Sequence, residues 1–269
     1  MVVGFAMGVT VCGVALADDS PRGEFLSLGD SIAFGFNPLV TGVDMADPDN
    51  YAGYPEFVAR EGHNSVDNAG CPGETSSSFL SATAPDNGCR EWKYYFGLHA
   101  DYETTQIEFA QAFVAAHPNL EYIAIDIGAN DIFVLQKACK YDPACVEAGL
   151  PATFYQYYVN LVTIYTTLRA AGFTGQFVGV TIYALDYTDA YSLPVITNLN
   201  NILKKVTAAF GGVIADGFEV FRQHTEDYGG DSCAAGLLIE LPDGTCDIHP
   251  NHRGQHRLAQ AVLGAVDRP

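Results

Sequence analysis

The sequence predicts an α/β protein with three layers, in which a central parallel sheet lies between helices on both faces. Short apolar runs typical of buried strands alternate along the chain with longer segments of helical periodicity, which is the pattern of parallel α/β folds. No linker rich in Pro, Ser or charge divides the 269 residues, and 48% of them are hydrophobic, enough for one substantial core. We therefore expect a single domain.

The first strand pattern is the apolar run Phe25-Leu26-Ser27-Leu28, which ends in Gly29-Asp30-Ser31. It predicts a buried strand that opens into a tight turn, with Ser31 at the carboxyl end of the strand. Open α/β sheets bind their ligands at this edge. Taken alone, the triplet indicates turn chemistry rather than catalysis, because Asp and Ser are common in turns.

Helix and strand patterns alternate along the rest of the chain. Helical spacing, as at Ile107, Ala110 and Val114, indicates a helix, and His117-Pro118 is typical of a helix end. The predicted helices cover residues 52–60, 104–116, 153–171, 196–210 and 254–266, and the predicted later strands cover 65–69, 121–127, 176–183 and 212–215. The segment 84–91 is predicted to be a turn-rich loop.

The charge balance excludes one class of partner. Thirteen Lys and Arg residues stand against 32 Asp and Glu residues, a formal net charge of -19. A chain with this charge and no basic stripe is repelled by phosphate backbones and anionic membrane surfaces. We expect no nucleic-acid partner, and we interpret the acid excess as a solvated surface.

Residues 1–17 are apolar and uncharged, and they end in Ala15-Leu16-Ala17. This pattern predicts a secretory signal peptide cut after Ala17, with residues 18–269 as the mature domain. The usual basic residues before the apolar run are missing, so either the true start lies upstream or the signal is unusual. The run is shorter than the roughly 20 residues that a membrane span needs, and we expect no stable membrane insertion.

Apart from Cys12 in the predicted signal, six cysteines fall in neighbouring pairs along the chain. The pairs are Cys71 with Cys89, Cys139 with Cys145, and Cys233 with Cys246. Each pair shares one loop-like segment, so we expect these three disulfides, although six cysteines allow 15 connectivities. No Cys-x-x-Cys sequence occurs, which argues against a zinc site, and disulfides are typical of exported proteins.

Four motif blocks resemble those of the SGNH (GDSL-type) hydrolases and occur in the order of that family. They are Gly29-Asp30-Ser31-Ile32, Asn68-Ala69-Gly70-Cys71-Pro72-Gly73-Glu74-Thr75, Gly128-Ala129-Asn130-Asp131 and His249-Pro250-Asn251. Any one block is weak evidence, but the four together span most of the mature chain. The resemblance implies a flavodoxin-like α/β/α fold. It also implies an oxyanion hole formed by the backbone N–H groups of Ser31 and Gly73 and the side-chain amide of Asn130.

The residue types themselves suit ester hydrolysis. A serine hydroxyl is inert at its own pKa, so Ser31 as nucleophile needs an imidazole to take its proton, and His249 is the candidate general base. Donors must also face the place where negative charge develops. A glycine lets the backbone approach a substrate closely, and an amide donates without changing its charge, as expected of Gly73 and Asn130.

The residue that supports His249 departs from the family pattern, which places an aspartate three residues before the histidine. That position is Cys246, whereas Asp247 stands two residues before His249. We expect Asp247 to orient the imidazole and stabilise its charge. The alternative is the backbone carbonyl of Cys246, which would orient the ring but stabilise its charge less.

The spacing of three histidines has competing interpretations. His252 and His256 continue the spacing from His249, which suggests a metal-binding helix face, but we expect Pro250 and Gly254 to interrupt such a helix and therefore expect no metal.

Asp30 and Asp131 resemble the paired carboxylates of a glycosidase. Because each belongs to a motif block, we expect Asp30 to hold its turn and Asp131 to cap or brace its loop.

Two groups of aromatic residues are candidates to line an acyl or sugar site, with ordinary packing as the simpler interpretation. They are Tyr94-Tyr95-Phe96 and the tyrosines Tyr155, Tyr157 and Tyr158.

We therefore predict a monomeric, secreted serine esterase that needs no cofactor. The resemblance implies lipid, small acyl or acetylated-glycan esters as substrates and leaves the choice among them open. A secreted binding protein that keeps the fold without catalysis is the alternative, and the irregular position of the acid is its support.

Overall fold

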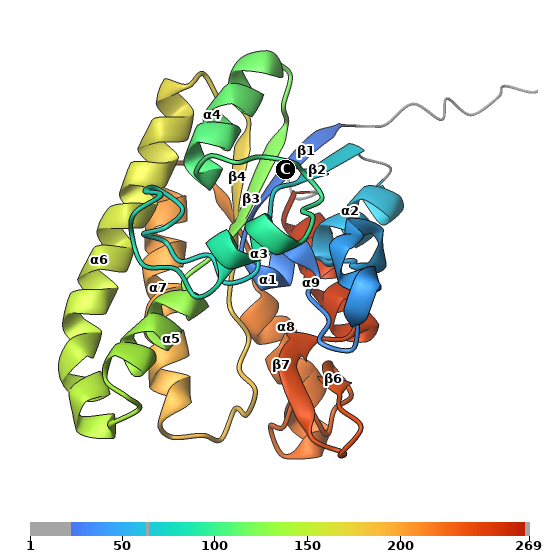
Figure 1. Ribbon diagram of the computed structural model, residues 1–269, viewed down its shortest axis with the longest axis vertical. Coiled ribbons are helices and arrows are strands. Elements are labelled where there is room, and N and C mark those ends of the chain that lie inside the picture. The colour runs from blue at the N-terminus through green and yellow to red at the C-terminus, as the bar shows by residue number, and fades with distance from the viewer. Residues whose placement is uncertain (1–22, 63–64, 267–269) are drawn as a thin grey trace, which may run out of the picture.

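The computed structural model describes residues 23–62 and 65–266, and a five-stranded parallel sheet forms its centre (Figure 1). The strands lie in the order β2-β1-β3-β4-β5. Their bounds are β1 Glu24–Gly29, β2 Ser65–Asn68, β3 Tyr122–Asp126, β4 Gln176–Val180 and β5 Val213–Ala215. The predicted fold class is confirmed, whereas the predicted signal peptide, residues 1–17, lies outside the described residues.

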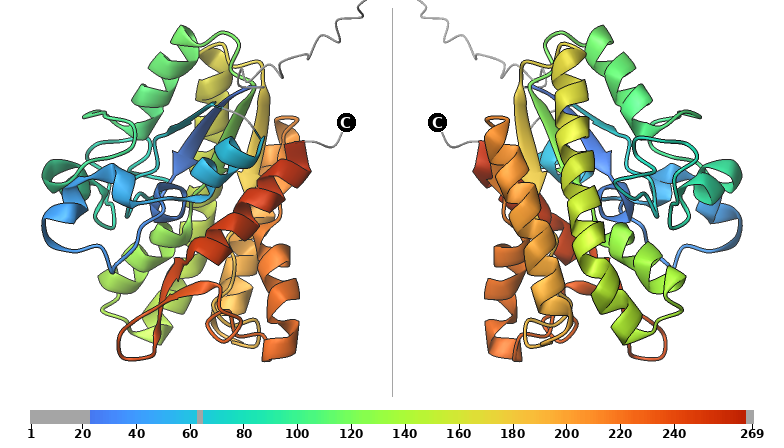
Figure 2. Two further views of the ribbon diagram at one scale, coloured as in Figure 1. Left: turned by 90° about the vertical axis from the view of Figure 1, so that its right-hand side faces the viewer. Right: turned by 90° about the vertical axis from the view of Figure 1, so that its left-hand side faces the viewer.

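Helices cover both faces of the sheet, so that the molecule has three layers (Figure 2). One face carries α2 (Tyr54–Gly62), α8 (Gly217–Thr225) and α9 (His252–Val266), and the other carries α4 (Gln106–Ala116), α6 (Pro143–Ala170) and α7 (Ser192–Ala209). The shorter helices are α1 (Ser31–Phe34), α3 (Cys89–Tyr95) and α5 (Ala129–Ala138), and 3₁₀ turns cover Gly42–Ala46, Pro48–Asn50 and Glu226–Tyr228. An antiparallel pair, β6 (Leu238–Glu240) and β7 (Cys246–Pro250), precedes α9.

Alternate residues of β1, β3 and β4 fill two apolar cores, one on each face of the sheet. In β1, Leu26 and Leu28 join the core beneath α4, α6 and α7, whereas Phe25 joins the core beneath α2 and α9. In β3, Ile123 belongs to the first core and Ala124 to the second. Because helices cover both faces, strands of this kind appear in the sequence as nearly continuous apolar runs.

The strand order creates a crevice between the carboxyl ends of β1 and β3. After β1 the chain passes to α2 on one face, and after β3 it passes to α6 on the other. Connections that diverge in this way leave the edge open between the two strands, which is where parallel sheets bind ligands. Ser31 follows β1, and Asn130 follows β3, so the first and third motif blocks border this crevice.

Three disulfides link neighbouring segments of the chain, in the pairing predicted from the sequence. The bridges are Cys71–Cys89, Cys139–Cys145 and Cys233–Cys246. Cys71–Cys89 lies after β2, Cys139–Cys145 lies between α5 and α6, and Cys233–Cys246 joins the segment after α8 to the first residue of β7, so none joins two strands of the parallel sheet.

Several elements differ from the predictions. Helix α6 begins at Pro143 rather than at residue 153, because Asp142 caps its first turn and Pro151 is accommodated inside the helix. The predictions do not include α3, α8 or the β6–β7 pair, each of which is short.

The predicted interruption at Gly254 is also wrong, because α9 runs through it. Asn251 caps this helix by accepting hydrogen bonds from the backbone N–H groups of Arg253 and Gly254. A Cβ at Gly254 would lie 2.3 Å from the carbonyl oxygen of Leu237, so this glycine allows close packing of the helix. Within the described part of the chain, no helix combines the length and apolar character that a membrane crossing requires.

We predict that Gly29→Ala destabilises the fold by about 3 kcal/mol or more, because Gly29 has φ +150° and a Cβ there would lie 2.2 Å from the carbonyl oxygen of Asp126. Gly264→Ala is the matched control. Gly264 is exposed in α9 with open space around it, so alanine should be neutral or stabilising by up to about 1 kcal/mol. Urea unfolding of both variants provides the measurement, and equal stability of the two would contradict this account of Gly29.

Candidate active site

Ser31, His249 and Asp247 lie in one hydrogen-bonded line at the crevice. Nε2 of His249 is 2.9 Å from Oγ of Ser31, and Nδ1 of the same ring contacts a carboxylate oxygen of Asp247. Among the described residues no hydrogen bond joins that ring to the carbonyl of Cys246, the alternative considered from the sequence. With a proton on Nδ1 facing the carboxylate, Nε2 has a free lone pair for the hydroxyl proton of Ser31.

Backbone contacts fix the position of Ser31. A carboxylate oxygen of Asp30 accepts the N–H of Ile32 at 3.0 Å and so caps the first turn of α1, as expected for this residue. The buried amide of Gln106, from α4, pairs with both backbone groups of Gly29: it accepts the N–H at 2.6 Å and donates to the carbonyl at 3.0 Å. These contacts satisfy the backbone where β1 ends and the chain turns into Ser31.

His249 is held from the other end of the chain. It lies on β7, beside the disulfide of Cys246, and the hydroxyl of Tyr183 donates to the carbonyl of Ile248 at 2.6 Å. The ring of Phe36 packs on the imidazole with centroids 4.7 Å apart. The histidine is therefore positioned by its strand, by a hydrogen bond to the neighbouring carbonyl and by an aromatic contact.

The carboxyl groups near the histidine differ in pKa. Burial alone would raise the pKa of Asp247, but the hydrogen bonds and charge of His249 outweigh burial and lower it, so Asp247 stays ionised at neutral pH. Burial raises the pKa of Asp30 to about 6, against the opposing effects of the Ile32 N–H, the His249 charge and the Asn130 amide. The site thus has an ionised carboxylate on the far side of the imidazole.

Three N–H donors border the space in front of Ser31. Within the described chain, the backbone N–H groups of Ser31 and Gly73 have no hydrogen-bond acceptor, and both residues line the cleft together with Asn130. Nδ2 of Asn130 donates to Asp30 at 3.1 Å, and because an amide carries two N–H groups, a second remains. The arrangement can stabilise negative charge that develops on an oxygen bound there.

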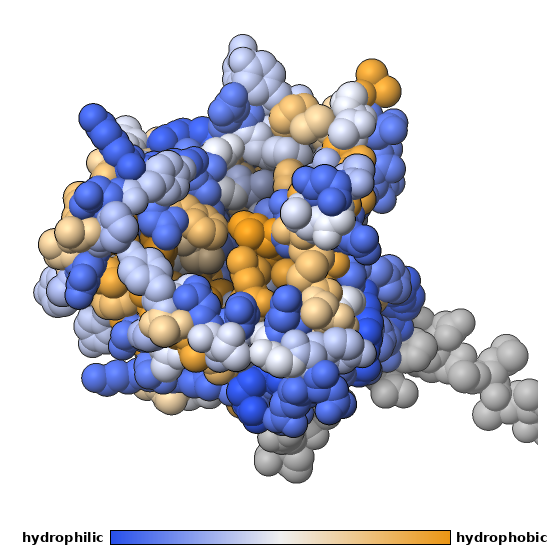
Figure 3. All heavy atoms as spheres, turned by 90° about the horizontal axis from the view of Figure 1, so that it is seen from below, coloured by the Kyte–Doolittle hydropathy of each residue, from blue (hydrophilic) through white to orange (hydrophobic). Residues whose placement is uncertain are grey.

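The cleft in front of Ser31 has a volume of about 630 Å³ and a largely apolar lining. In the space-filling view, hydrophobic residues in orange form the floor of a hollow on this face (Figure 3). The walls come from α5, α6 and α7, which contribute Ile132, Phe133, Val146, Leu150, Val195 and Leu199. A cleft of this size and polarity accommodates an extended apolar group.

Other residues singled out from the sequence lie outside the reacting centre. The carboxylate of Asp131 accepts hydrogen bonds from the backbone and side chain of Ser76, so it links the third motif block to the residue that follows the second block, whereas the sequence predicts that it caps or braces its own loop. His252 and His256 both pack edge-on against Phe57.

The predicted aromatic runs divide into three groups. Tyr95 and Phe96 line the cleft. Tyr157 is fully buried, and its hydroxyl donates to the carbonyl of Ile127 at 2.8 Å. Tyr155 and Tyr158 are exposed outside the cleft.

Sequence reasoning missed the polar residues that support the site, above all Gln106, Asn87 and Glu74. Gln106 and Asn87 have partners that are distant in the chain, and a single buried polar residue leaves no periodic signal in the sequence. Glu74 belongs to the second motif block, but the block itself indicates no role for it. The signal that could have indicated one is an acidic residue directly after Gly73 in that block.

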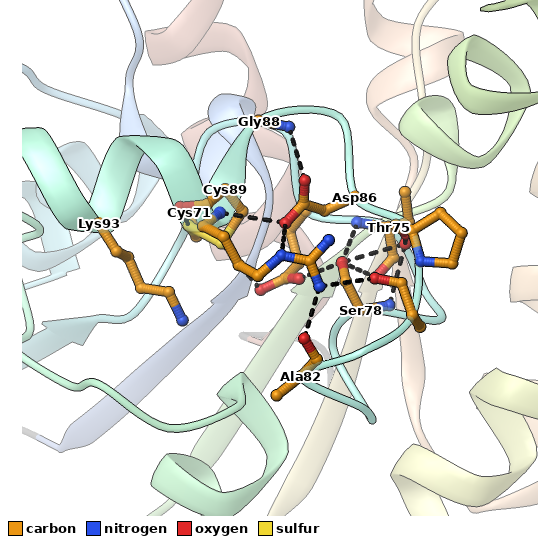
Figure 4. A network of polar contacts seen from close by, with 12 residues as sticks. Cys71, Thr75, Ser78, Ala82, Asp86, Gly88, Cys89 and Lys93 are labelled. Carbon is orange, nitrogen blue, oxygen red and sulfur yellow. Dashed lines mark hydrogen bonds and ion pairs between the residues drawn. A yellow bond between two sulfur atoms is a disulfide. The ribbon is translucent and has the colours of Figure 1, made fainter.

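Glu74 lies in a polar network behind the second motif block. One carboxylate oxygen accepts a hydrogen bond from the hydroxyl of Ser78, and the other accepts one from the amide of Gln106 at 3.3 Å. Figure 4 shows the disulfide between Cys71 and Cys89 on one side of this network and Ser78 on the other. Burial raises the pKa of Glu74 to about 7.

One group of side chains in the described part of the chain has the spacing of metal ligands, namely Cys71, Glu74 and Cys89. The two sulfurs form a disulfide and so are not thiolates, the form in which cysteine binds metal.

The molecule has three α/β/α layers and brings a serine, a histidine and a carboxylate together at the carboxyl edge of its sheet, an arrangement that serine hydrolases use. The chain belongs to the GDSL-like lipase/acylhydrolase family, whose model matches residues 27–257. This confirms the family resemblance of the four motif blocks.

Solved structures with the same fold include three enzymes of low sequence identity. A phospholipase A1 from Streptomyces albidoflavus is 18% identical, with a TM-score of 0.58 over 90% of this chain and 99% of that one. An acetylxylan esterase from Geobacillus stearothermophilus is 16% identical, with a TM-score of 0.57 over 93% and 97%. An α/β hydrolase from the metagenome of Lake Arreo is 17% identical, with a TM-score of 0.58 over 91% and 95%. A search of curated protein sequences found no significant match.

The raised pKa of Glu74 gives stability a defined pH dependence. The folded protein keeps a proton on this carboxyl that an unfolded chain, with a pKa of 4.5, releases. This contribution to stability is fully present below pH 4.5 and is lost as the pH rises through about 7.

We predict that the free energy of unfolding of the wild type falls by about 3 kcal/mol relative to that of Glu74→Gln between pH 4.5 and pH 7. Glutamine keeps the shape of the side chain but does not ionise. Urea unfolding of both proteins across this range provides the measurement. A difference in stability that stays constant with pH would contradict the prediction, whatever its absolute size.

Proposed function

We propose that this protein is a secreted serine esterase that hydrolyses carboxylic esters through an acyl-enzyme on Ser31. The observation that carries the proposal is the distance of 2.9 Å between Oγ of Ser31 and Nε2 of His249, with Asp247 on the other ring nitrogen. This line of groups opens into a cleft bordered by free N–H donors. Nucleophile, base and stabilising donors are the groups that acyl transfer requires.

In the proposed reaction, His249 takes the hydroxyl proton as Oγ of Ser31 attacks the ester carbonyl carbon. The carbonyl oxygen becomes negative and receives hydrogen bonds from the N–H groups of Ser31 and Gly73 and from the amide of Asn130. The tetrahedral intermediate collapses, and the alcohol leaves with the proton from His249. Water then attacks the acyl-enzyme by the same route and releases the acid, while ionised Asp247 stabilises the imidazolium in both halves.

The apolar cleft favours an ester with an extended acyl chain over an acetyl ester. Its volume of about 630 Å³ is far larger than an acetyl group requires, and its walls are apolar. Of the neighbours in fold, the phospholipase A1 is named for a lipid substrate and the acetylxylan esterase for an acetylated glycan. The apolar walls support a lipid-type acyl group for this protein.

Secretion is supported by the chemistry of the cysteines. Three disulfides persist in an oxidising environment such as the exterior of a cell, and the apolar leader predicted for residues 1–17 agrees with export. Mass spectrometry of the N-terminus of protein recovered from culture medium tests the proposed cleavage after Ala17.

We predict that the purified mature protein hydrolyses p-nitrophenyl esters, that turnover rises from acetate toward longer acyl chains, and that Ser31→Ala abolishes it. The variant lacks the attacking oxygen, so the loss should be at least about a thousandfold. A fluorophosphonate should label the wild type and not the variant. Equal turnover in both proteins would refute the role of Ser31, and absence of both turnover and labelling would favour the binding protein considered from the sequence.

We predict that Asp247→Asn lowers kcat by at least about a hundredfold, because an amide neither stabilises the imidazolium nor holds its tautomer as a carboxylate does. Asp243→Asn is the charge-matched control, since Asp243 lies on the exposed turn before β7 and bonds Thr245. Steady-state kinetics of both variants on one ester provide the measurement. Nearly full activity of Asp247→Asn would assign support of the ring to the backbone instead.

A further inference from the structure

The loop between Cys71 and Cys89 carries a residue that contacts two members of the proposed oxyanion hole. The disulfide closes the neck of this loop, with Gly73 just inside one end and Asn87 just inside the other. The backbone N–H of Asn87 donates to the carbonyl of Gly73 at 2.8 Å. A Cβ at Gly73, which has φ +87°, would lie 2.7 Å from the carbonyl atoms of Asn87, so the two backbones are in direct contact.

The side chain of Asn87 contacts the third donor. Its Nδ2 donates to Oδ1 of Asn130 at 2.7 Å, and its own Oδ1 accepts a hydrogen bond from Nζ of Lys137, on the exposed side of α5. At the other end, Nδ2 of Asn130 donates to Asp30. A continuous chain of hydrogen bonds therefore runs from Lys137 through Asn87 and Asn130 to Asp30, and all its donors point in one direction.

We propose that Asn87 is a positioning residue for the oxyanion hole and that Lys137 polarises it, an inference that rests on the proposed esterase function. An asparagine amide has almost the same shape after a 180° flip, so packing alone does not decide whether its oxygen or its nitrogen faces the cleft. The donor from Asn87 assigns the oxygen of Asn130 to the loop side. The nitrogen of Asn130 then faces Asp30 and the substrate.

The Lys137 ammonium acts on the same chain by polarisation. A cation bound to the oxygen of Asn87 makes the N–H groups of that amide stronger donors, and the effect passes along consecutive hydrogen bonds. The N–H of Asn130 that remains for the substrate oxygen becomes a stronger donor in turn. Interactions with this oxygen are strongest in the transition state, so the effect should appear in kcat rather than in KM.

The first experiment measures kcat and KM of Asn87→Ala, Asn130→Ala and the double variant on a short-chain ester. Asn87→Ala keeps the backbone contact with Gly73 and removes only the side chain. We expect kcat to fall about tenfold or more with KM changed less than about twofold. In the Asn130→Ala background the same change should have almost no further effect. Independent, multiplicative losses from the two substitutions would overturn the proposal.

Asn87→Asp separates positioning from a merely structural role. Aspartate has the same shape and keeps an acceptor for Lys137, but it offers no N–H to Oδ1 of Asn130 when ionised. We expect its kcat to fall at least as far as that of Asn87→Ala, while the urea unfolding midpoint stays close to that of the wild type. Full activity of Asn87→Asp would show that the donor is not needed.

Lys137→Met, with Lys140→Met as the matched control, tests polarisation. Both lysines are exposed near the end of α5, and in the described chain Lys140 makes no side-chain hydrogen bond. We expect a fall in kcat of about threefold for Lys137→Met, none for Lys140→Met, and no added effect of Lys137→Met in the Asn87→Ala background. Equal effects of the two lysine variants would remove Lys137 from the proposal.

A second readout does not depend on activity. The side-chain amide resonances of Asn130, assigned by their loss in Asn130→Ala, should shift in Asn87→Asp and in Lys137→Met but not in Lys140→Met. Absence of these shifts would overturn the positioning role even if the protein is an esterase. Conversely, the protein could show these shifts of the Asn130 resonances, hydrolyse no ester and remain unlabelled by a fluorophosphonate. That result would confirm the hydrogen-bonded chain and refute the proposed function.

Discussion

The hydrogen bond between His249 and Ser31 joins residues 218 positions apart, and much of the architecture serves to make it possible. Ser31 directly follows β1, which is an inner strand of the sheet between β2 and β3. Helices pack on both faces of the sheet there. His249 comes from a short strand pair outside the sheet, held by a disulfide and by the hydroxyl of Tyr183. Two separately supported elements, one a strand of the central sheet and the other a strand of the β6–β7 pair, thus bring a hydroxyl and an imidazole together.

The donors that face Ser31 are held by a different means. Gly73 and Asn130 lie on segments that follow β2 and β3, and hydrogen bonds between polar side chains connect these segments in addition to apolar packing. Gln106, Glu74, Asn87 and Asp131 each link one segment of the site to another. Buried polar networks of this type are costly unless every member is satisfied, and when satisfied they define one geometry.

Sequence patterns predicted the sheet well because its strands are apolar on both faces and are separated by amphipathic helices. The positions of Ser31, Gly73 and Asn130 were likewise predictable, since each lies in a motif block that follows a strand, whereas the block of His249 lies within β7 and at the start of α9. Asp247 does not have the spacing from the histidine that the family pattern predicts. Its carboxylate is the chemical reason to expect it to support His249, and in the structure this carboxylate contacts the ring of His249.

The supporting residues could not be predicted in the same way. Asn87 contacts a residue 43 positions away, and Gln106 contacts the backbone of Gly29 across 77 positions. Neither contact follows a helical or strand period. The early part of α6 differs for the opposite reason: proline is unfavourable inside a helix and the predicted helix begins after Pro151, but the helix in the structure begins at Pro143 and runs through Pro151.

The three disulfides have a common consequence for where this protein can work. They close loops of 18, 6 and 13 positions: the first lies after β2, the second between α5 and α6, and the third between the segment after α8 and the start of β7. None joins two strands of the sheet, whose stability comes from its own apolar layers. The Cys71–Cys89 bridge is itself buried in one of the two apolar cores, in the same loop as Gly73. Reduction of this bridge would therefore loosen the loop that carries Gly73 and one part of the core together.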